Sequence, residues 1–336
     1  MDPKITQRYS PAILHEAVQR FGIDEQKIEL LDGFESFIYS FSRPEGEFIL
    51  RIGHSLRRSQ ELILGEVDWI NYLAAGGAGV AKAVLSNEAK LVEFIPDGQG
   101  GFFMATAFEK AGGGPAGGEM WNPTLFQAWG RNLGRIHALS KDYMPSRPAW
   151  KRGEWDSPVN LQVENWLPAS DTAILGKFQE LMAYLQMLPK DREGYGLIHQ
   201  DAHAGNFFVD QDYKITLFDF DDCVYSWFVY DIAMVLFYGL MAHEGDPDYV
   251  RSFTRPFLEG YHQENKLDPV WLAEIPHFLK LREIDLYAQI LFSFGGPDQI
   301  DDPWCQNYMK GRKEKIESGS PYIDFNWDSL AAALRP

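Results

Sequence analysis

One short hairpin constrains this chain more than any other segment, because polar side chains stand at both of its open ends. Residues 207–209 form an apolar run suited to a strand, and residues 210–212 are polar and turn-forming. A second run, 215–218, is rich in β-forming residues. Two strands joined by this turn bring Asn206, before the first strand, close to Asp219, after the second.

The three side chains near this hairpin match the needs of a phosphoryl-transfer site. Magnesium prefers oxygen ligands and is usually held by one or two side chains plus substrate phosphates. Asn206 offers an amide oxygen and Asp219 a carboxylate, so both are predicted magnesium ligands. Asp201 lies five positions before Asn206 and is predicted to accept a proton from an attacking hydroxyl group. The alternative is an ordinary hairpin flanked by two acidic turns.

These residues also carry a resemblance to a known family. The pattern His199-x-Asp201-x-x-x-x-Asn206 resembles the catalytic loop of the protein-kinase-like superfamily. With His203 and the sequence Asp219-Phe220-Asp221, it is more similar to the aminoglycoside phosphotransferase branch, which includes choline, homoserine and fructosamine kinases. The resemblance implies that Asp201 is the catalytic base and that Asn206 and Asp219 bind Mg²⁺, with ATP or GTP as co-substrate.

The resemblance also implies the fold class, an α+β, two-lobed protein-kinase-like fold. A small β-sheet lobe at residues 1–108 is expected to bind the nucleotide. A larger, mainly helical lobe at 109–336 is expected to hold the catalytic loop and the acceptor. Helices are expected at 60–75, 125–139, 178–188, 253–264, 271–289 and 308–316.

The segment after the hairpin separates this chain from protein kinases. Asp221 stands where those enzymes have the glycine of D-F-G, and only residues 222–230 precede an apolar helix that starts at Asp231. This connector leaves no room for a loop that cradles a peptide, so a small-molecule acceptor is expected. Asp231 has two compatible interpretations, an N-cap or the family's brace of the catalytic loop. Asp221 or Asp222 is a further candidate for a second metal contact.

A basic and an acidic residue in the first lobe form a predicted pair. Glu66 lies on the apolar stripe of the helix at 60–75, where a carboxylate is costly without a partner. Arg51, on a predicted strand at 48–52, is the natural candidate. The pair resembles the Lys–Glu pair of kinases, with an arginine in the lysine position. The alternative is a purely structural ion pair.

Further nucleotide contacts are assigned by position. The loop at 32–39 contains one glycine, and Ser36 with neighbouring N–H groups is placed to meet a phosphate, a plain β-turn being the alternative. The strand at 101–109 is expected to end in a hinge whose backbone binds adenine, at Thr106 to Phe108. The glycine-rich run at 111–118 is expected to be a lobe boundary, a mobile rim or a surface loop.

The acceptor site is the least specified part of the chain. In related kinases the helices of the C-terminal lobe build this pocket, so Arg282 and Asp285 are candidates, with a solvated helix face as the alternative. Net charge is −17, which disfavours nucleic acid as a partner. Nine acids and two bases between Asp191 and Asp231 give a local balance of −7, which favours metal dependence and a cationic acceptor.

Composition sets the remaining limits. With 336 residues, 45% of them hydrophobic, the chain can bury a substantial core. No run of 18 apolar residues is present, so no membrane partner is expected. The first residues lack a signal-peptide pattern, and Cys223 and Cys305 form no disulfide framework or metal cluster, so a cytoplasmic protein is expected.

The sequence therefore predicts a small-molecule kinase that moves the γ-phosphoryl group of ATP or GTP to a hydroxyl group. An amino sugar, an amino alcohol, a sugar and an antibiotic all fit the same catalytic loop, because specificity resides in the variable helical lobe. One alternative is a non-catalytic pseudokinase or scaffold, against which the intact Asp201, Asn206 and Asp219 argue. The other is a protein kinase, against which the short connector at 222–230 argues.

Overall fold

The computed structural model describes residues 2–31, 33, 35–327 and 329–330, which fold as two compact units. The sheet unit comprises Met1–Pro115, Asp142–Arg152 and Phe207–Asp221, and the helical unit comprises Ala116–Lys141, Gly153–Asn206 and Asp222–Pro336. The sequence predicts one boundary, after residue 108. The two units instead interleave along the chain, and the hairpin at 207–217 belongs to the sheet unit. None of the described helices combines the length and apolarity needed to cross a membrane.

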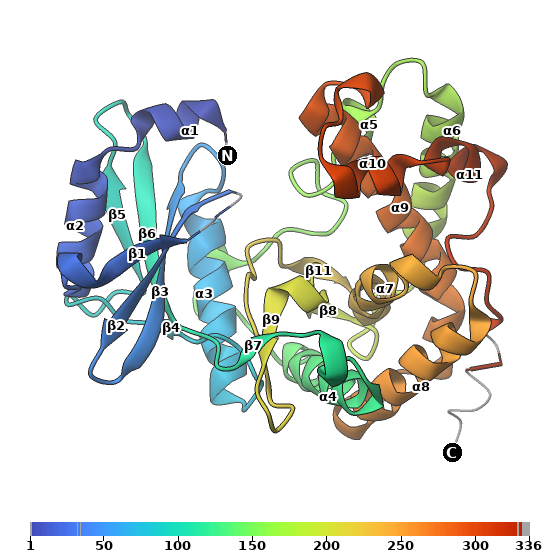
Figure 1. Cartoon of the computed structure of the whole chain (residues 1–336), viewed down its shortest axis with the longest axis horizontal. Coiled ribbons are helices and arrows are strands. Elements are labelled where there is room, and N and C mark those ends of the chain that lie inside the picture. The colour runs from blue at the N-terminus through green and yellow to red at the C-terminus, as the bar shows by residue number, and fades with distance from the viewer. Residues whose placement is uncertain (1, 32, 34, 328, 331–336) are drawn as a thin grey trace. The chain divides into compact units, whose positions relative to one another are not determined.

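The sheet unit is built on a six-stranded antiparallel sheet of order β1-β2-β3-β6-β4, with β5 also paired to β6. Its strands are β1 (Ile28–Leu31), β2 (Phe37–Arg43), β3 (Gly46–His54), β4 (Ala83–Val84), β5 (Val92–Pro96) and β6 (Phe102–Glu109). Helices α1 (Pro3–Arg8) and α2 (Pro11–Phe21) precede the sheet, and α3 (Gln60–Ala75) follows β3. Helices α2 and α3 lie on opposite faces of the sheet (Figure 1).

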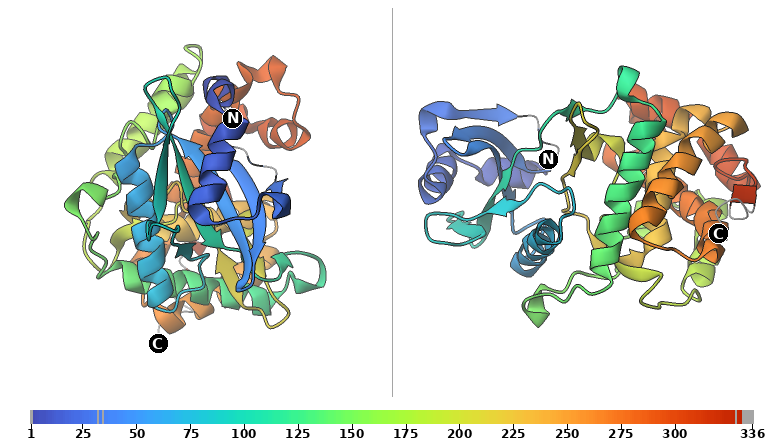
Figure 2. Two further views of the ribbon diagram at one scale, coloured as in Figure 1. Left: turned by 90° about the vertical axis from the view of Figure 1, so that its left-hand side faces the viewer. Right: turned by 90° about the horizontal axis from the view of Figure 1, so that it is seen from below.

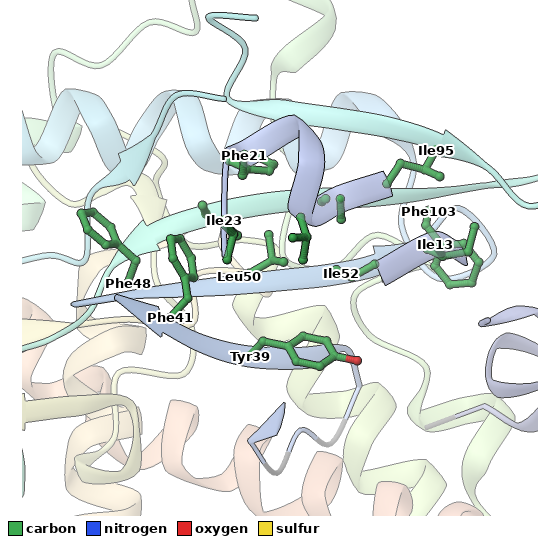
Figure 3. Close-up of a cluster of buried hydrophobic side chains, with 14 of the residues drawn as sticks. Ile13, Phe21, Ile23, Tyr39, Phe41, Phe48, Leu50, Ile52, Ile95 and Phe103 are labelled. Carbon is green, nitrogen blue, oxygen red and sulfur yellow. The ribbon is translucent and has the colours of Figure 1, made fainter. Parts of the chain in front are cut away.

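Strand alternation decides which side chains of β3 reach which helix. Leu50 and Ile52 are fully buried in an apolar cluster that includes Phe21 of α2 (Figure 3). Arg51 lies between them and therefore points to the other face of the sheet, toward α3. Helix α3 has the predicted bounds, and its N-cap is Ser59, whose hydroxyl accepts a hydrogen bond from the N–H of Leu62.

The predicted hairpin is present as β9 (Phe207–Val209) and β10 (Ile215–Leu217), with Phe207 opposite Leu217. The carboxylate of Asp210 closes its turn by accepting the N–H groups of Asp212 and Lys214. A third strand, β7 (Gly114–Pro115), pairs with β9.

Part of the glycine-rich run is therefore sheet, so the expectation of a mobile rim or a surface loop is wrong for that part. The two units do divide within this run, between Pro115 and Ala116, in agreement with the expected boundary. Gly113 has φ 82°, and a Cβ there would lie 2.1 Å from the carbonyl oxygen of Val209. Only glycine permits this approach of two backbones.

The helical unit combines a two-stranded ribbon with a set of packed helices. Its helices are α4 (Pro123–Ser140), α5 (Val163–Trp166), α6 (Thr172–Leu185), α7 (Phe228–Gly239), α8 (Pro247–Glu264), α9 (Ile275–Phe294), α10 (Pro303–Met309) and α11 (Arg312–Ser318). The ribbon pairs β8 (Tyr195–Ile198) with β11 (Val224–Trp227), so the connector at 222–230 contains a strand. The single helix predicted at 308–316 is wrong, because Gly311 adopts φ 67° and separates α10 from α11.

Helices α4 and α8 run side by side in a close crossing that depends on glycine (Figures 1 and 2). A Cβ at Gly130 of α4 would lie 1.8 Å from the carbonyl oxygen of Phe257, and one at Gly260 of α8 would lie 1.9 Å from that of Gln127. Each helix therefore packs its backbone directly against the other, and neither position has room for a methyl group.

This crossing gives a prediction on stability. We expect Gly130→Ala to lower the free energy of unfolding by about 2 kcal/mol, because overpacking outweighs the ~1 kcal/mol gain in helix propensity. The matched control is Gly176→Ala in α6, where the added methyl group meets nothing within 4 Å. This change should raise the free energy of unfolding by about 0.5–1 kcal/mol. Urea unfolding followed by circular dichroism measures both, and equal midpoints for the two variants would contradict the argument.

Candidate active site

The catalytic-loop segment that follows β8 is clamped by one buried carboxylate of the helical unit. Asp231 of α7 is fully buried and accepts the backbone N–H groups of His199 at 2.8 Å and Gln200 at 2.6 Å. Gln200 has φ 71°, a conformation that non-glycine residues rarely adopt. Trp227 occupies the N-cap of α7, so the N-cap interpretation of Asp231 is wrong and the contacts are those of a brace.

A buried chain of hydrogen bonds stands behind Asp231. His137 Nε2 lies 3.0 Å from Asp231 Oδ2, and His137 Nδ1 lies 2.8 Å from the hydroxyl of Tyr261. Burial lowers the pKa of His137 despite the opposing effect of Asp231. A neutral ring then donates from Nε2 to Asp231 and accepts from Tyr261 at Nδ1, while Asn265 Nδ2 donates to Tyr261 at 2.8 Å. The sequence marks none of these three residues as partners of the loop.

Asp201 keeps one oxygen uncommitted. Its Oδ2 accepts from Asn206 Nδ2 at 3.0 Å and lies 3.3 Å from His203 Nε2. Among the described residues Oδ1 is buried without a hydrogen-bond partner, and Arg282 Nη2 lies 3.9 Å from it. Burial raises the pKa of the Asp201 carboxyl, but His203 and then Arg282 lower it more strongly, to about 2. This carboxylate can accept a hydrogen bond from a bound hydroxyl group.

The orientation of the Asn206 amide follows from its acceptors. Its Nδ2 donates to the backbone oxygen of Asp201 at 2.9 Å as well as to the carboxylate, so Oδ1 is left as an acceptor. Asn206 is bonded to Phe207, the first residue of β9, which pairs with Leu217. Asp219 follows two residues after Leu217 and has φ 62°, a strained conformation that is typical of functional positions.

These donors fit a hard cation only in part. Within the part of the chain that the structure describes, no group of three or more His, Cys, Asp or Glu side chains could hold a metal ion. Amide and carboxylate oxygens are the ligands that Mg²⁺ prefers, and this ion usually completes its coordination with phosphate and water oxygens. Asn206 of the helical unit and Asp219 of the sheet unit each offer such an oxygen, and their shared role as metal ligands stays a prediction.

The two acceptor candidates of α9 lie beside Asp201 and are not on a solvated face, so that alternative is wrong. Arg282 Nη1 donates to Asp285 Oδ2 at 2.9 Å, and its Nη2 donates to the hydroxyl of Tyr238 at 2.5 Å. Burial raises the pKa of Asp285, and Arg282 opposes this effect. The ring of His203 lies 4.7 Å from that of Tyr238. Tyr238 is a member of this cluster that sequence reasoning missed.

In the sheet unit, the predicted pair of Arg51 and Glu66 is present. Arg51 Nη1 donates to Oε1 at 2.8 Å and Nη2 to Oε2 at 2.6 Å, in a bidentate pair. Burial opposes the charge of Arg51, but Glu66 and then Asp221 raise its pKa above its usual value. A pocket of this unit is lined in part by Ser36, Arg51, Arg57, Arg58, Thr106 and Asp221.

The predicted hinge differs from the structure. Thr106 and Phe108 lie inside β6, where Thr106 pairs with Arg51 and Val92 and Phe108 pairs with Ile49 and Ala83. Strands on both edges occupy the backbone there, so the expectation that this backbone binds adenine is wrong.

The side chains of these two residues still lie near Arg51. The Thr106 hydroxyl donates to the backbone oxygen of Arg51 at 3.4 Å, and the Phe108 ring centroid is 5.1 Å from the guanidinium carbon. Their role as nucleotide contacts stays a prediction, as does that of Ser36. Asp32 and Phe34 of the predicted phosphate loop lie outside the described residues.

Asp221 is held by arginines that no sequence pattern singles out. Its carboxylate accepts hydrogen bonds from Arg57 and from Arg58 Nε, the latter at 3.0 Å, and its backbone oxygen accepts from Arg152 at 2.6 Å. Burial raises the pKa of Asp221, but Arg58 and Arg57 hold it well below its usual range. These contacts give the carboxylate cationic partners within the sheet unit, which disfavours the idea of a second metal contact.

Comparison with known proteins agrees with this geometry. The family model described as the phosphotransferase enzyme family matches residues 28–273. The amicoumacin kinase of Bacillus subtilis (strain 168) is 38% identical over 322 residues, which cover 95% of each chain. A solved structure of amicoumacin kinase hAmiN in complex with AMP-PNP, Ca²⁺ and Ami has a TM-score of 0.92 and 37% identity, over 98% of this chain and 100% of that one.

A more distant structure shares the fold. The microcompartment-associated aminopropanol kinase has a TM-score of 0.72 at 23% identity, over 92% of this chain and 98% of its own. The predicted α+β, two-lobed kinase-like fold class is confirmed, as is the resemblance read from the catalytic loop. The chain is an enzyme that belongs to the phosphotransferase family.

Proposed function

We propose that the chain transfers the γ-phosphoryl group of ATP to a hydroxyl group of amicoumacin or of a closely related small molecule. Two relatives that bear the name amicoumacin kinase support the acceptor, since each aligns with nearly the whole chain at 37–38% identity. The adenine nucleotide analogue bound in one of them supports ATP as the donor.

The observation that carries the proposal is the state of Asp201. The pKa of its carboxyl is lowered to about 2, one of its oxygens is buried without a hydrogen-bond partner among the described residues, and the backbone before it is held by Asp231. An acceptor hydroxyl would complete the hydrogen bonding of Oδ1. Asp201 then orients the hydroxyl oxygen toward the phosphorus atom and takes its proton as the new bond forms.

Nucleotide binding is assigned to three further positions. Asn206 and Asp219 supply oxygen ligands for Mg²⁺, which would neutralise the phosphate charge when bound. Support comes from the hairpin, since Asn206 directly precedes β9 and Asp219 lies two residues after the end of β10. Arg51, oriented by Glu66, steadies the phosphates.

The acceptor side is assigned to the cluster next to Asp201. Arg282 and Asp285 form a charge-balanced pair, and the pair is held in place by Tyr238. We propose that this pair shapes the pocket for the acceptor. Because Arg282 approaches the same oxygen of Asp201 that would receive the hydroxyl, it also limits how that hydroxyl can approach.

The first prediction tests the base. We expect Asp201→Asn to lower kcat by a factor of roughly 10²–10⁴, because the amide cannot accept the proton, while nucleotide affinity changes little. Acceptor-dependent ADP release with amicoumacin measures the first quantity, and calorimetry with MgATP measures the second. The matched control, Asp212→Asn in the exposed turn of the same hairpin, should behave as the wild type. Unchanged turnover of Asp201→Asn would overturn the assignment. If the wild type binds the nucleotide tightly but phosphorylates no acceptor, a pseudokinase is favoured.

The second prediction concerns metal. Asn206→Ala should raise the Mg²⁺ concentration required for half-maximal activity by about tenfold or more, since one of the proposed protein ligands is lost. Titration of Mg²⁺ at fixed ATP measures this, with Asp212→Asn again as the control. An unaltered Mg²⁺ requirement would remove Asn206 from the metal site.

The third prediction concerns pH. Arg282 lowers the pKa of Asp201, so its removal should raise that pKa and move the acidic limb of the kcat profile to higher pH. We expect this shift in the double variant Arg282→Met with Asp285→Asn, which avoids a buried unpaired carboxylate. Arg282→Lys retains the charge and should keep the limb at low pH. Superimposed pH profiles for the double variant and the wild type would contradict the role of Arg282.

A further inference from the structure

Several guanidinium groups surround a single carboxylate in the sheet unit. Arg57 and Arg58 donate to the side chain of Asp221, and Arg152 donates to its backbone oxygen. Arg57 also forms an ion pair with Glu35, in the loop that precedes β2. Both Arg57 and Arg58 line the same pocket as Ser36, Arg51 and Thr106.

Three guanidinium groups gather in this pocket. Three arginines line it, and Asp221 is the carboxylate among its lining residues. Arg51 is paired with Glu66, Arg57 is paired with Glu35, and Arg57 and Arg58 both donate to one oxygen of Asp221. Guanidinium groups that converge in this way can bind an anion that accepts several hydrogen bonds, once one of their carboxylate partners is exchanged.

Exposure identifies which arginine can change partners. The Arg57 side chain is 21% exposed and its partner Glu35 is 45% exposed, so water can replace this contact at little cost. Arg58 is 12% exposed, and Arg152 is buried. These two therefore hold Asp221 in place when Arg57 moves. Both loop arginines also stand directly before Ser59, the N-cap of the sixteen-residue helix α3, whose N-terminus adds partial positive charge.

We infer that Arg57, supported by Arg58, is a phosphate-binding residue of the nucleotide pocket. In this assignment Arg57 releases the carboxylate of Glu35 and binds oxygens of the terminal phosphates of a nucleoside triphosphate. Before the nucleotide binds, Asp221 supplies a negative charge to Arg57. The inference rests on the proposed function, because it assumes that the pocket takes a nucleotide. The competing reading is a structural clasp between Glu35, Arg57 and Asp221 that no ligand enters.

The test is a comparison of ligands that differ in phosphate number. Calorimetry with MgATP, MgADP and adenosine is performed on the full chain and on Arg57→Gln. A lost charge-assisted hydrogen bond should weaken MgATP binding by roughly 10- to 100-fold and leave adenosine binding within about twofold. Arg57→Lys should recover part of the loss. Lys90→Gln is the matched control, since it removes one positive charge from an exposed turn of the same unit and should leave all affinities unchanged.

Two outcomes would overturn the inference. One is equal MgATP affinity for Arg57→Gln and the wild type. The other is an equal loss for MgATP and adenosine, which is the result expected of a clasp. Glu35→Gln separates the readings further, because it should keep or improve MgATP affinity if Glu35 competes with phosphate and weaken it if the clasp is structural. A wild-type chain that binds neither MgATP nor MgADP would instead refute the proposed function itself.

Discussion

The catalytic loop depends on the burial of one carboxylate among hydrogen-bond donors. A buried charge is costly unless it is fully compensated, and Asp231 receives two backbone N–H groups and the imidazole of His137. The same bonds hold Gln200 in a left-handed conformation that a free chain would avoid. Because Gln200 immediately precedes Asp201, the hydrogen bonds of Asp231 constrain the backbone next to the residue that we propose as the base.

The same rule applies to the other buried carboxylates, and it distinguishes those with a structural role from Asp201. Glu66 is compensated by Arg51, and Asp285 by Arg282. Glu283 of α9 is compensated by Arg312, so the C-terminal helices are tied by a buried ion pair as well. Breaking such a pair on one side leaves an uncompensated charge that costs several kcal/mol. Asp201 differs from these carboxylates, since one of its oxygens has no hydrogen bond among the described residues.

How far the sequence predicts this site depends on whether the residues lie on regular elements that are close in sequence. The hairpin, the helix at 60–75 and the pair of Arg51 and Glu66 follow from local periodicity and from the cost of a carboxylate on an apolar stripe. Periodicity could not find the contact between Arg57 and Asp221, which are 164 positions apart and joined only by tertiary folding. Periodicity also predicted one helix at 308–316, which the positive φ of Gly311 divides in the structure.

The prediction of a hinge was wrong for a related reason. The predicted strand at 101–109 nearly matches β6, but a run of β-forming residues does not show where strand pairing stops, so a hinge with a free backbone was expected at Thr106 to Phe108. In the structure their backbone is enclosed by neighbouring strands, and only their side chains remain available.

The pKa of Asp201 has a consequence for how the proposed reaction is accelerated. A carboxyl group whose pKa is about 2 is a weak base near neutral pH, so it cannot remove the proton of an alcohol before the alcohol attacks. Its contribution must come from holding the hydroxyl oxygen in line with the phosphorus atom and from accepting the proton late, when the oxygen has become acidic through bonding. Such a role requires fixed geometry more than basicity, which is what the clamped loop, the Asn206 amide and Arg282 provide.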